Sequence, residues 1–326
     1  MDMPTLEQAV IWTVAYADIF DYPMTAQEIH WFLWGMPASE SEIADLLCGG
    51  LLPPGTLSSV SAQGDEPAMP YYTLPGREHL VAVRQRRRRI ARRLWERAWA
   101  YAAAIASLPF VRMVALTGSL AAGNTEAGAD IDYLIVTAPG RLWLCRAGVI
   151  GIGRLAARRG DTVCPNYILA ENSLSLRERN LYTAREFAQM VPLYGLDVYR
   201  RLRAENPWVN AYLPNARGQP CLAPLVYACR RVRHEAHLAA FTRALESLMM
   251  TPPCDWLERW EMRRKIRKFN RQREFHPESA FSADWCKGHF NDHMTRTLQQ
   301  FALRARVAAV EEPDNWIAQA DALALA

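Results

Sequence analysis

The first fifty residues carry hydrophobic side chains at helical spacing in three short segments separated by turn signals. Residues 6–20 repeat apolar side chains every three or four positions, as one face of an amphipathic helix does. Thr25 and Glu28 form a capping-box pattern that starts a second helix, and residues 40–48 are expected to form a third. Residues 71–78 have the pattern of a strand and turn, so the sequence predicts three short helices before a β-ribbon.

The central part of the chain alternates apolar strands with a helical segment. One apolar run ends at Gly118, a loop of small residues follows, and a second apolar run occupies residues 131–136. Residues 141–159 have the pattern of a helix, and residues 162–170 that of a third strand. This strand–strand–helix–strand order predicts a small mixed sheet, in a protein of the α+β or α/β class.

From about residue 182 onward the chain is helical in pattern, with proline-rich breaks. A helix is expected to begin near Thr183, because Glu186 follows it at the capping-box distance. A separate arginine-rich helical pattern precedes the first central strand. The chain therefore divides into four parts, namely residues 1–78, a connecting helix at 79–108, a sheet-containing core at 109–181 and an α-helical C-terminal domain at 182–326.

Length and composition fit a protein of more than one domain without a membrane segment. The chain has 326 residues, of which 50% are hydrophobic, and its formal net charge is +4. No apolar run reaches the length that spans a bilayer, and the first residues lack the pattern of a secretory signal. The 7 cysteines include no Cys-x-x-Cys pair and are typical of reduced thiols. We therefore expect a cytoplasmic protein that makes no membrane contact.

One short motif carries the most specific chemical signal. Gly118 and Ser119 end one strand, and after ten residues Asp130 and Asp132 stand two positions apart at the next. Residues i and i+2 of a strand face the same side, so both carboxylates project together while Ile131 faces away. Carboxylates held this close favour a bound cation, and Mg²⁺ suits them together with substrate phosphates. Gly118 allows close backbone approach, and Ser119 offers a hydroxyl and an N–H to phosphate.

The motif resembles the signature of the polymerase-beta-like nucleotidyltransferase superfamily, which is Gly-Ser, roughly ten residues, and Asp-x-Asp on the next strand. The resemblance covers about twenty residues. It implies transfer of a nucleoside monophosphate from a nucleoside triphosphate, with one or two Mg²⁺ ions held by Asp130 and Asp132. It also implies that Gly118, Ser119 and Asn124 bind the nucleotide. The alternative is a surface hairpin with two solvated aspartates. It is disfavoured, because residues 133–136 have the pattern of a buried strand, which a plain loop would not need.

The superfamily uses a third acid on a neighbouring strand, where this chain is expected to present Asn166. Cys164, Asn166 and Ile168 are expected on one face of that strand. An amide oxygen can ligate a metal, yet it brings no negative charge and cannot act as a general base. Either Asn166 serves in catalysis as a neutral ligand with another base, or the site binds nucleotide without efficient transfer. The acids that could substitute are Asp161, Glu171 and, if its helix packs at the pocket mouth, Glu186.

Two basic runs are candidates for binding nucleic acid. The run from Arg84 to Arg97 lies on the connecting helix, where a solvated face with some internal ion pairs is the favoured interpretation. The run from Arg259 to Arg273 is interleaved with Trp256, Trp260 and Phe269. Basic residues with aromatics suit single-stranded nucleic acid, but aromatics at helical spacing are more often core, and we expect them there.

The N-terminal segment resembles a winged-helix domain, a fold that often binds DNA. Its expected recognition helix carries Glu40, Glu42 and Asp45 and no basic residue, so the phosphates of DNA would repel it. We therefore expect this domain to pack within the protein or to contact another protein.

The sequence thus predicts a Mg²⁺-dependent nucleotidyltransferase whose acceptor is an RNA, a protein or a small molecule. The alternative from another class is a catalytically degenerate protein that binds nucleotide or nucleic acid in a regulatory or scaffold role. A zinc site at Cys286, His289 and His293 is disfavoured, because His276 is the only near candidate for a fourth ligand.

Overall fold

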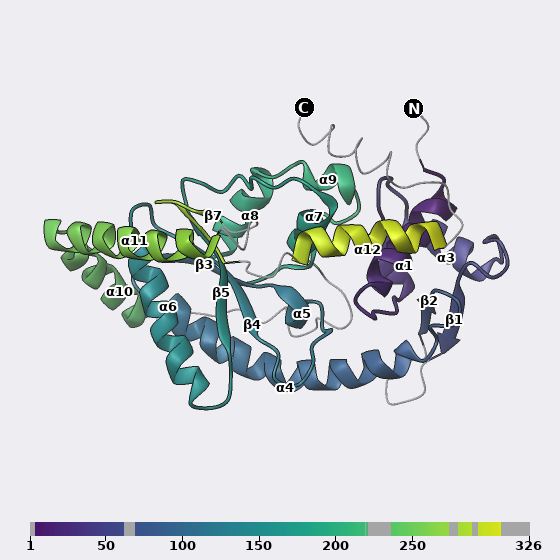
Figure 1. Ribbon diagram of the computed structural model, residues 1–326, viewed down its shortest axis with the longest axis horizontal. Helices are drawn as coiled ribbons and strands as arrows, with labels where there is room; N and C mark the ends of the chain where they lie inside the picture. Colours follow the sequence, from purple (N-terminus) through teal and green to yellow (C-terminus); the bar gives the residue numbers. More distant parts are fainter. Residues whose placement is uncertain are drawn as a thin grey trace.

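The computed structural model describes residues 4–61, 69–218, 220, 236–273, 280–288 and 293–307. Within these residues the protein is a mixed α+β structure, which confirms the predicted class. A six-stranded mixed sheet lies at the centre with helices packed around it, and a separate two-stranded ribbon lies near the N-terminal helices (Figure 1).

The N-terminal segment has the predicted helices and ribbon. Its elements are α1 (Leu6–Asp18), α2 (Ala26–Trp31), α3 (Glu40–Cys48), β1 (Ser58–Ser61) and β2 (Pro70–Thr73). Each helix begins with a capping box, in which the hydroxyl of Thr5, Thr25 or Ser39 accepts a hydrogen bond from the third helical N–H. Residues 62–68, between β1 and β2, fall outside the described residues.

Helix α12 (His293–Val307), close to the end of the chain, packs against α1 at its beginning (Figure 1). The ring of Phe301 is buried against Tyr16 and Trp34, at centroid distances of 5.5 and 5.4 Å. Arg304 Nε donates to the Asp18 carboxylate at 2.6 Å. A C-terminal helix therefore completes the hydrophobic core of the N-terminal segment.

Helix α4 (Leu80–Ala106) is the predicted connecting helix, and it runs beneath the ribbon and the sheet in Figure 1. Arg84 is almost fully buried, and its guanidinium donates to both Glu28 oxygens at 2.6 and 2.7 Å. The same group lies over the rings of Tyr22 and Tyr71. Burial by itself would raise the pKa of Glu28, but the charge and hydrogen bonds of Arg84 hold that pKa below its ordinary value.

Replacing Arg84 with methionine should destabilise the protein by about 3–5 kcal/mol, because the Glu28 carboxylate would remain buried without its cation. Urea unfolding at pH 7 measures this free energy. The matched control is Arg86→Met, since Arg86 is exposed on the same helix and should change stability by less than about 0.5 kcal/mol. Equal stabilities of the two variants would contradict the role assigned to the buried ion pair.

The other arginines of α4 divide between ion pairs and solvent, as the sequence predicts. Arg87 pairs with Glu126 at 2.6 Å, and Arg97 pairs with Asp161 at 2.5 Å. The exposed members of the run are Arg86, Arg89, Arg92, Arg93 and Arg97. The helix therefore combines structural ion pairs with a basic outer face, and nucleic-acid binding by this face stays a prediction.

The central sheet has the strand order β6-β3-β4-β5-β8-β7. Its middle part follows the predicted order, with elements β3 (Val111–Leu116), α5 (Gly118–Ala121), β4 (Ile131–Thr137), α6 (Leu142–Ala157) and β5 (Val163–Ala170). Strand β3 pairs antiparallel with β4, whereas β4 and β5 are parallel and joined through α6. Gly118 and Ser119, which precede a predicted loop, instead begin the one-turn helix α5.

The C-terminal part of the chain is not wholly helical, and in this respect the prediction for residues 182–326 is wrong. Three short strands from it join the sheet, namely β6 (Val191–Tyr194), β7 (Ala280–Phe281) and β8 (Trp285–Lys287). Strands of two to four residues are too short to show an alternating pattern. The helices here are α7 (Leu181–Gln189), α8 (Leu196–Ala204), α9 (Val209–Tyr212), α10 (Ala236–Met249) and α11 (Pro252–Arg273).

Helix α11 carries the aromatic residues of the second basic run. Phe269 is buried and stacks on Phe281 at a centroid distance of 4.6 Å, which confirms its predicted place in the core. Trp256 and Trp260 are 61% and 47% exposed, so the prediction that they are core residues is wrong. They lie on the side of α11 turned away from α6, the helix against which α11 packs.

Candidate functional site

The glycine–serine bend and the two aspartates meet at the adjoining ends of β3 and β4. The N–H of Thr117 donates to the backbone oxygen of Asp132 at 2.9 Å. Gly118 has a φ of +66°, and a Cβ placed on it would lie 2.5 Å from Asp132 Oδ2. This position therefore requires glycine, both for its left-handed backbone and for the close approach of the carboxylate. Ile131 is fully buried, as expected for the opposite face of the strand.

The two aspartates concentrate negative charge beside the bend. Asp130 is exposed just before β4, and Asp132 is half-buried. Burial and, second, the charge of Asp130 raise the pKa of Asp132 to about 6, although a hydrogen bond with the Cys164 side chain opposes this shift. A divalent cation would relieve the repulsion between the two carboxylates, since its charge favours their ionised forms.

Strand β5 brings Cys164 and Asn166 to the same cavity, but with a bulge that breaks the predicted alternation. The register of β4 and β5 passes from the Asp132–Cys164 pair to the Leu134–Tyr167 pair. Two residues of β5, the proline at position 165 and its neighbour at 166, therefore stand opposite one residue of β4, at position 133. Ile168 therefore turns to the face opposite Cys164, and the predicted common face of these residues is wrong. Proline cannot donate to the strand ladder, which explains why the bulge falls at this point.

Glu186 on α7 is a third acid at this site. Helix α7 packs against α5, and Glu186 lines the cavity together with Asp132 and Asn166. Burial and, second, the charge of Asp132 raise the pKa of Glu186 to about 7, although a hydrogen bond from the Gly118 N–H opposes the shift. Asn180 caps α7 by accepting from the Thr183 N–H at 2.9 Å, so the predicted capping box at Thr183 and Glu186 is wrong. The Glu186 carboxylate is turned to the cavity instead.

The other two acids considered as substitutes are engaged elsewhere. Asp161 accepts a hydrogen bond from Tyr101 Oη at 2.7 Å and pairs with Arg97. Glu171 pairs with Arg201 at 2.5 Å. Neither acid lines the cavity, so among these candidates Glu186 alone has the position that a participating acid needs.

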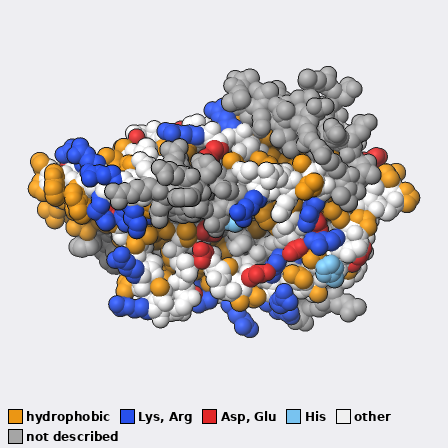
Figure 2. Space-filling model, viewed as in Figure 1, with side chains coloured by type: hydrophobic (Ala, Val, Ile, Leu, Met, Phe, Trp, Pro, Cys, Tyr) orange, Lys and Arg blue, Asp and Glu red, His pale blue; other side chains and the backbone are white. Residues whose placement is uncertain are grey.

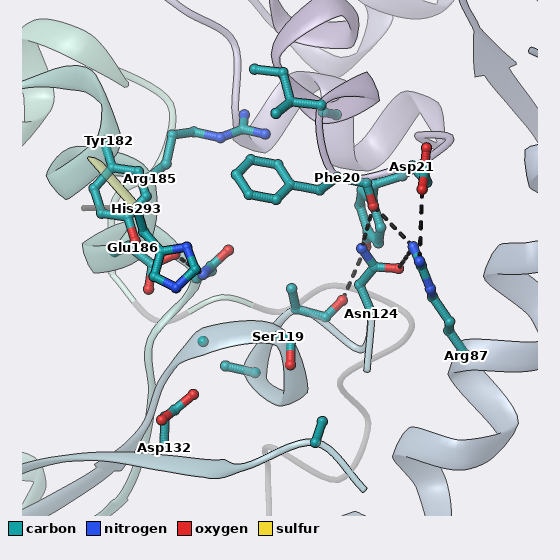
Figure 3. Close-up of a pocket in the computed structure, with 18 of the residues that line it drawn as sticks. Phe20, Asp21, Arg87, Ser119, Asn124, Asp132, Tyr182, Arg185, Glu186 and His293 are labelled. Carbon is teal, nitrogen blue, oxygen red and sulfur yellow. Dashed lines mark hydrogen bonds and ion pairs between the residues drawn. The ribbon is translucent and has the colours of Figure 1, made fainter. Parts of the chain in front are cut away.

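These groups form one side of a cavity of about 870 Å³, which is in the range of ligand-binding pockets. In Figure 3, Asp132, Glu186 and His293 lie on one side, and Ser119 stands between them and the opposite wall. That wall comes from the turn between α1 and α2. The cavity therefore lies where the N-terminal segment meets the sheet.

Phe20 in this turn is a cavity residue that the sequence analysis missed, since no local pattern marks it. It is 41% exposed, and its ring points into the cavity in Figure 3. Its carbonyl oxygen accepts from Asn124 Nδ2 at 2.8 Å and from an Arg87 NH group at 3.0 Å. Asn124 thus lines the cavity and holds the turn in place, and its predicted contact with a nucleotide stays a prediction.

Arg185, next to Glu186 on α7, brings a buried positive charge to the cavity. Its guanidinium lies 4.7 Å from the ring centroid of Tyr16 and 4.2 Å from that of Phe32. Burial lowers the pKa of Arg185 to about 10, and the nearby tyrosines and acids oppose the shift. Within the described part of the chain it forms no ion pair with an acid, so an anionic ligand group would be favourable here.

For the nucleotide site that the resemblance implies, Gly118→Ala should lower Mg²⁺-dependent nucleotide affinity by at least about tenfold, and it should reduce stability by about 1–2 kcal/mol. The new Cβ would displace the Asp132 carboxylate, in addition to straining the backbone. Calorimetry measures the affinity, and urea unfolding measures the stability. Gly128→Ala is the matched control, because Gly128 has a φ of +79° with no atom within 4 Å of its Cβ position. It should lose stability alone, and an equal loss of affinity there would contradict the steric argument.

The donors in this cavity fit Mg²⁺ better than zinc. Cys286 is buried in β8 and His293 lines the cavity, whereas His276 and His289 lie outside the described residues. Among the residues that the structure describes, no group of three or more His, Cys, Asp or Glu is placed to hold a metal ion by itself. Two carboxylates are what Mg²⁺ commonly takes from a protein when substrate phosphates supply further ligands.

Compared with protein-family models, curated proteins and solved structures, the chain has no match. None of the helices in the described ranges combines the length and the apolar character needed to cross a membrane.

Proposed function

We propose that the protein is a Mg²⁺-dependent nucleotidyltransferase that moves a nucleoside monophosphate from a nucleoside triphosphate to an acceptor. One observation carries the proposal: the Asp132 carboxylate lies against Gly118 in a cavity that also contains Asp130 and Glu186. This arrangement supports the resemblance to polymerase-beta-like enzymes. In the proposed architecture, a winged-helix-like domain and a largely helical C-terminal region flank a nucleotidyltransferase core.

Asp130 and Asp132 would hold one or two Mg²⁺ ions, with Asn166 as a neutral oxygen donor at the same place. Bound Mg²⁺ supplies neutralisation of the phosphate charges and alignment of the reacting groups. The N–H of Ser119 would donate to a β- or γ-phosphate oxygen of the triphosphate, and its hydroxyl, which donates to Thr125 Oγ1 at 3.3 Å, would do so after rotating toward the ligand.

In the reaction, a nucleophilic atom of the acceptor bonds to the α-phosphorus as the bond from that phosphorus to the bridging oxygen breaks. Pyrophosphate leaves with the bonding electron pair, and the acceptor proton passes to a base. Glu186 is suited to this role, because its carboxylate lines the cavity with Asp132 and burial raises its pKa above the ordinary value, which makes it a better proton acceptor. Asn166 cannot take this role, since an amide has no basic oxygen of comparable strength.

The test is transfer of label from each of the four nucleoside triphosphates in the presence of Mg²⁺ and pools of RNA, protein and small-molecule extract. Label in the α-phosphate should enter a product, whereas label in the γ-phosphate should leave as pyrophosphate, and EDTA should stop both. Nucleotide binding without transfer to any pool would favour the alternative, a catalytically degenerate regulatory or scaffold protein. No binding of any nucleotide would overturn the transferase proposal and would leave a scaffold or nucleic-acid-binding role as the alternative.

A further inference from the structure

The outer face of α11 exposes tryptophan and arginine side chains together. The rings of Trp256 and Trp260 are nearly parallel, at 18°, with centroids 6.5 Å apart. The guanidinium of Arg264 lies 5.3 Å from the ring centroid of Trp260. The shallow groove here, about 200 Å³, is lined by Trp256, Arg259, Trp260, Arg263, Arg264 and Arg267. We name these six residues the α11 groove.

The inner side of α11 shows why this face remains outside. The Glu258 carboxylate accepts from the N–H groups of Trp143 and Leu144, each at 2.8 Å, in the first turn of α6. Asp255 pairs with Arg141 at 2.5 Å, just before that turn. The helix is thus fixed to the core through its acidic side chains, and its tryptophans and most of its arginines are left to solvent.

The α11 groove carries positive charge with little internal neutralisation. Arg259, Arg263 and Arg267 recur every four residues, about 6 Å apart along the helix, and all are exposed. Within the described ranges these three form no ion pair with an acid, whereas Arg264 pairs with Glu261 at 2.7 Å. Basic and hydrophobic side chains gather at the end of the molecule formed by α10 and α11, on the left in Figure 2. This row of charge complements a polyanionic backbone.

We propose that the α11 groove binds single-stranded nucleic acid, with bases stacked on Trp256 and Trp260 and phosphates on the arginines. Aromatic platforms beside a basic track bind such strands with little sequence preference, because every base has a stacking face. A duplex keeps its base faces covered, so exposed tryptophans favour a single strand. An anionic membrane favours a helix whose apolar and basic residues occupy separate faces, whereas here arginines and tryptophans line one concave groove.

Fluorescence anisotropy with a labelled twelve-nucleotide oligo-U and its oligo-dT counterpart, each titrated at several salt concentrations, tests the proposal and separates RNA from DNA. Replacing Trp256 and Trp260 with alanine should weaken binding by about tenfold or more, with the salt dependence unchanged. Replacing Arg259, Arg263 and Arg267 with alanine should flatten the slope of log K against log salt by about 2. A duplex of the same length should bind the wild type more weakly than the single strands.

Two control variants make the result specific. Trp256→Phe with Trp260→Phe keeps the stacking faces and should retain most of the affinity. The triple alanine variant at Arg154, Arg158 and Arg159 removes equal charge from exposed positions outside both basic runs and should leave the affinity nearly unchanged. Equal binding by the wild type and both α11 alanine variants would overturn the proposal.

Binding to phosphatidylserine vesicles without any binding to the oligonucleotides would also overturn it, in favour of a membrane surface. The assays contain no nucleoside triphosphate, so their outcome is independent of the proposed transferase activity.

Discussion

Replacing Asp130 and Asp132 together by asparagine should abolish Mg²⁺-dependent nucleotide binding. Asp132 lies against Gly118 and Asp130 lines the same cavity, and amides of the same size keep the shape of the site while removing the charge of both side chains. Any transfer activity should fall by about a thousandfold or more, since several kcal/mol of transition-state stabilisation depend on a bound metal ion. Isothermal titration calorimetry of each nucleotide, with Mg²⁺ and with EDTA, measures the binding.

Asp45→Asn with Asp197→Asn is the matched control for this pair. Both residues are exposed on helices away from the cavity, and the variant changes the net charge by the same amount. It should bind nucleotide as the wild type does. Retained Mg²⁺-dependent binding in the Asp130 and Asp132 variant would rule out the proposed metal site.

Glu186→Gln should reduce transfer by about 10²- to 10⁴-fold, because glutamine keeps the shape of the side chain and cannot accept the acceptor proton. The same variant should be more stable than the wild type at pH 8. Burial and the charge of Asp132 raise the pKa of Glu186 from its ordinary value of 4.5 to about 7, so the ionised form is disfavoured in the folded protein. Removing that charge should stabilise the fold by about 1–3 kcal/mol at pH 8.

Because the pKa of Glu186 is raised in the folded protein, the stabilisation by Glu186→Gln should depend on pH. The folded protein binds the Glu186 proton more tightly than the unfolded chain, so the wild type loses stability as pH rises from about 4.5 to about 7. The stability difference between variant and wild type should therefore be near zero at pH 4, grow across this window and then level off. Urea unfolding in EDTA at pH 4, 6 and 8 measures it. Glu205→Gln, at an exposed site, should show no such trend, and a flat difference for Glu186→Gln would contradict its raised pKa.

The part of the site that the sequence predicts is the part set by short-range geometry. The spacing of Asp130 and Asp132 predicts their positions, just before β4 and at its second residue. The three N-terminal helices were also predictable, since each carries a capping box. In these cases the residues that determine the structure lie within a few positions of each other, so a pattern in the sequence can record them. The steric need for glycine at position 118 is different, since it follows from the contact with Asp132, which is far from it in the sequence.

The remaining features of the site depend on packing between segments that are distant in the sequence. Glu186 reaches the cavity because α7 packs against α5, and Phe20 reaches it because Arg87 and Asn124 hold its turn. No local pattern distinguishes these residues from others of their type. The bulge at Asn166 has the same origin, since it appears only in the pairing of β5 with β4.

For the exposed tryptophans of α11, the sequence pattern predicts the arrangement of the side chains but not their burial. Helical spacing of Trp256 and Trp260 predicts a common face, and the structure has that face, but spacing cannot say whether the protein covers it. On the packed face, the Glu258 carboxylate accepts from the first turn of α6, and Phe269 is buried against Phe281. Polar anchoring therefore acts together with hydrophobic packing on the side of this helix that meets the core.

The wall contributed by Phe20 makes the cavity depend on the N-terminal segment. A fragment cut at the end of α4 would retain Asp130, Asp132 and Glu186 yet lose one boundary of the pocket, because that boundary belongs to the first twenty or so residues. The central sheet without the N-terminal segment would therefore leave this cavity open to solvent. Changing which ligand the cavity accepts would therefore require substitutions in segments that lie far apart in the sequence.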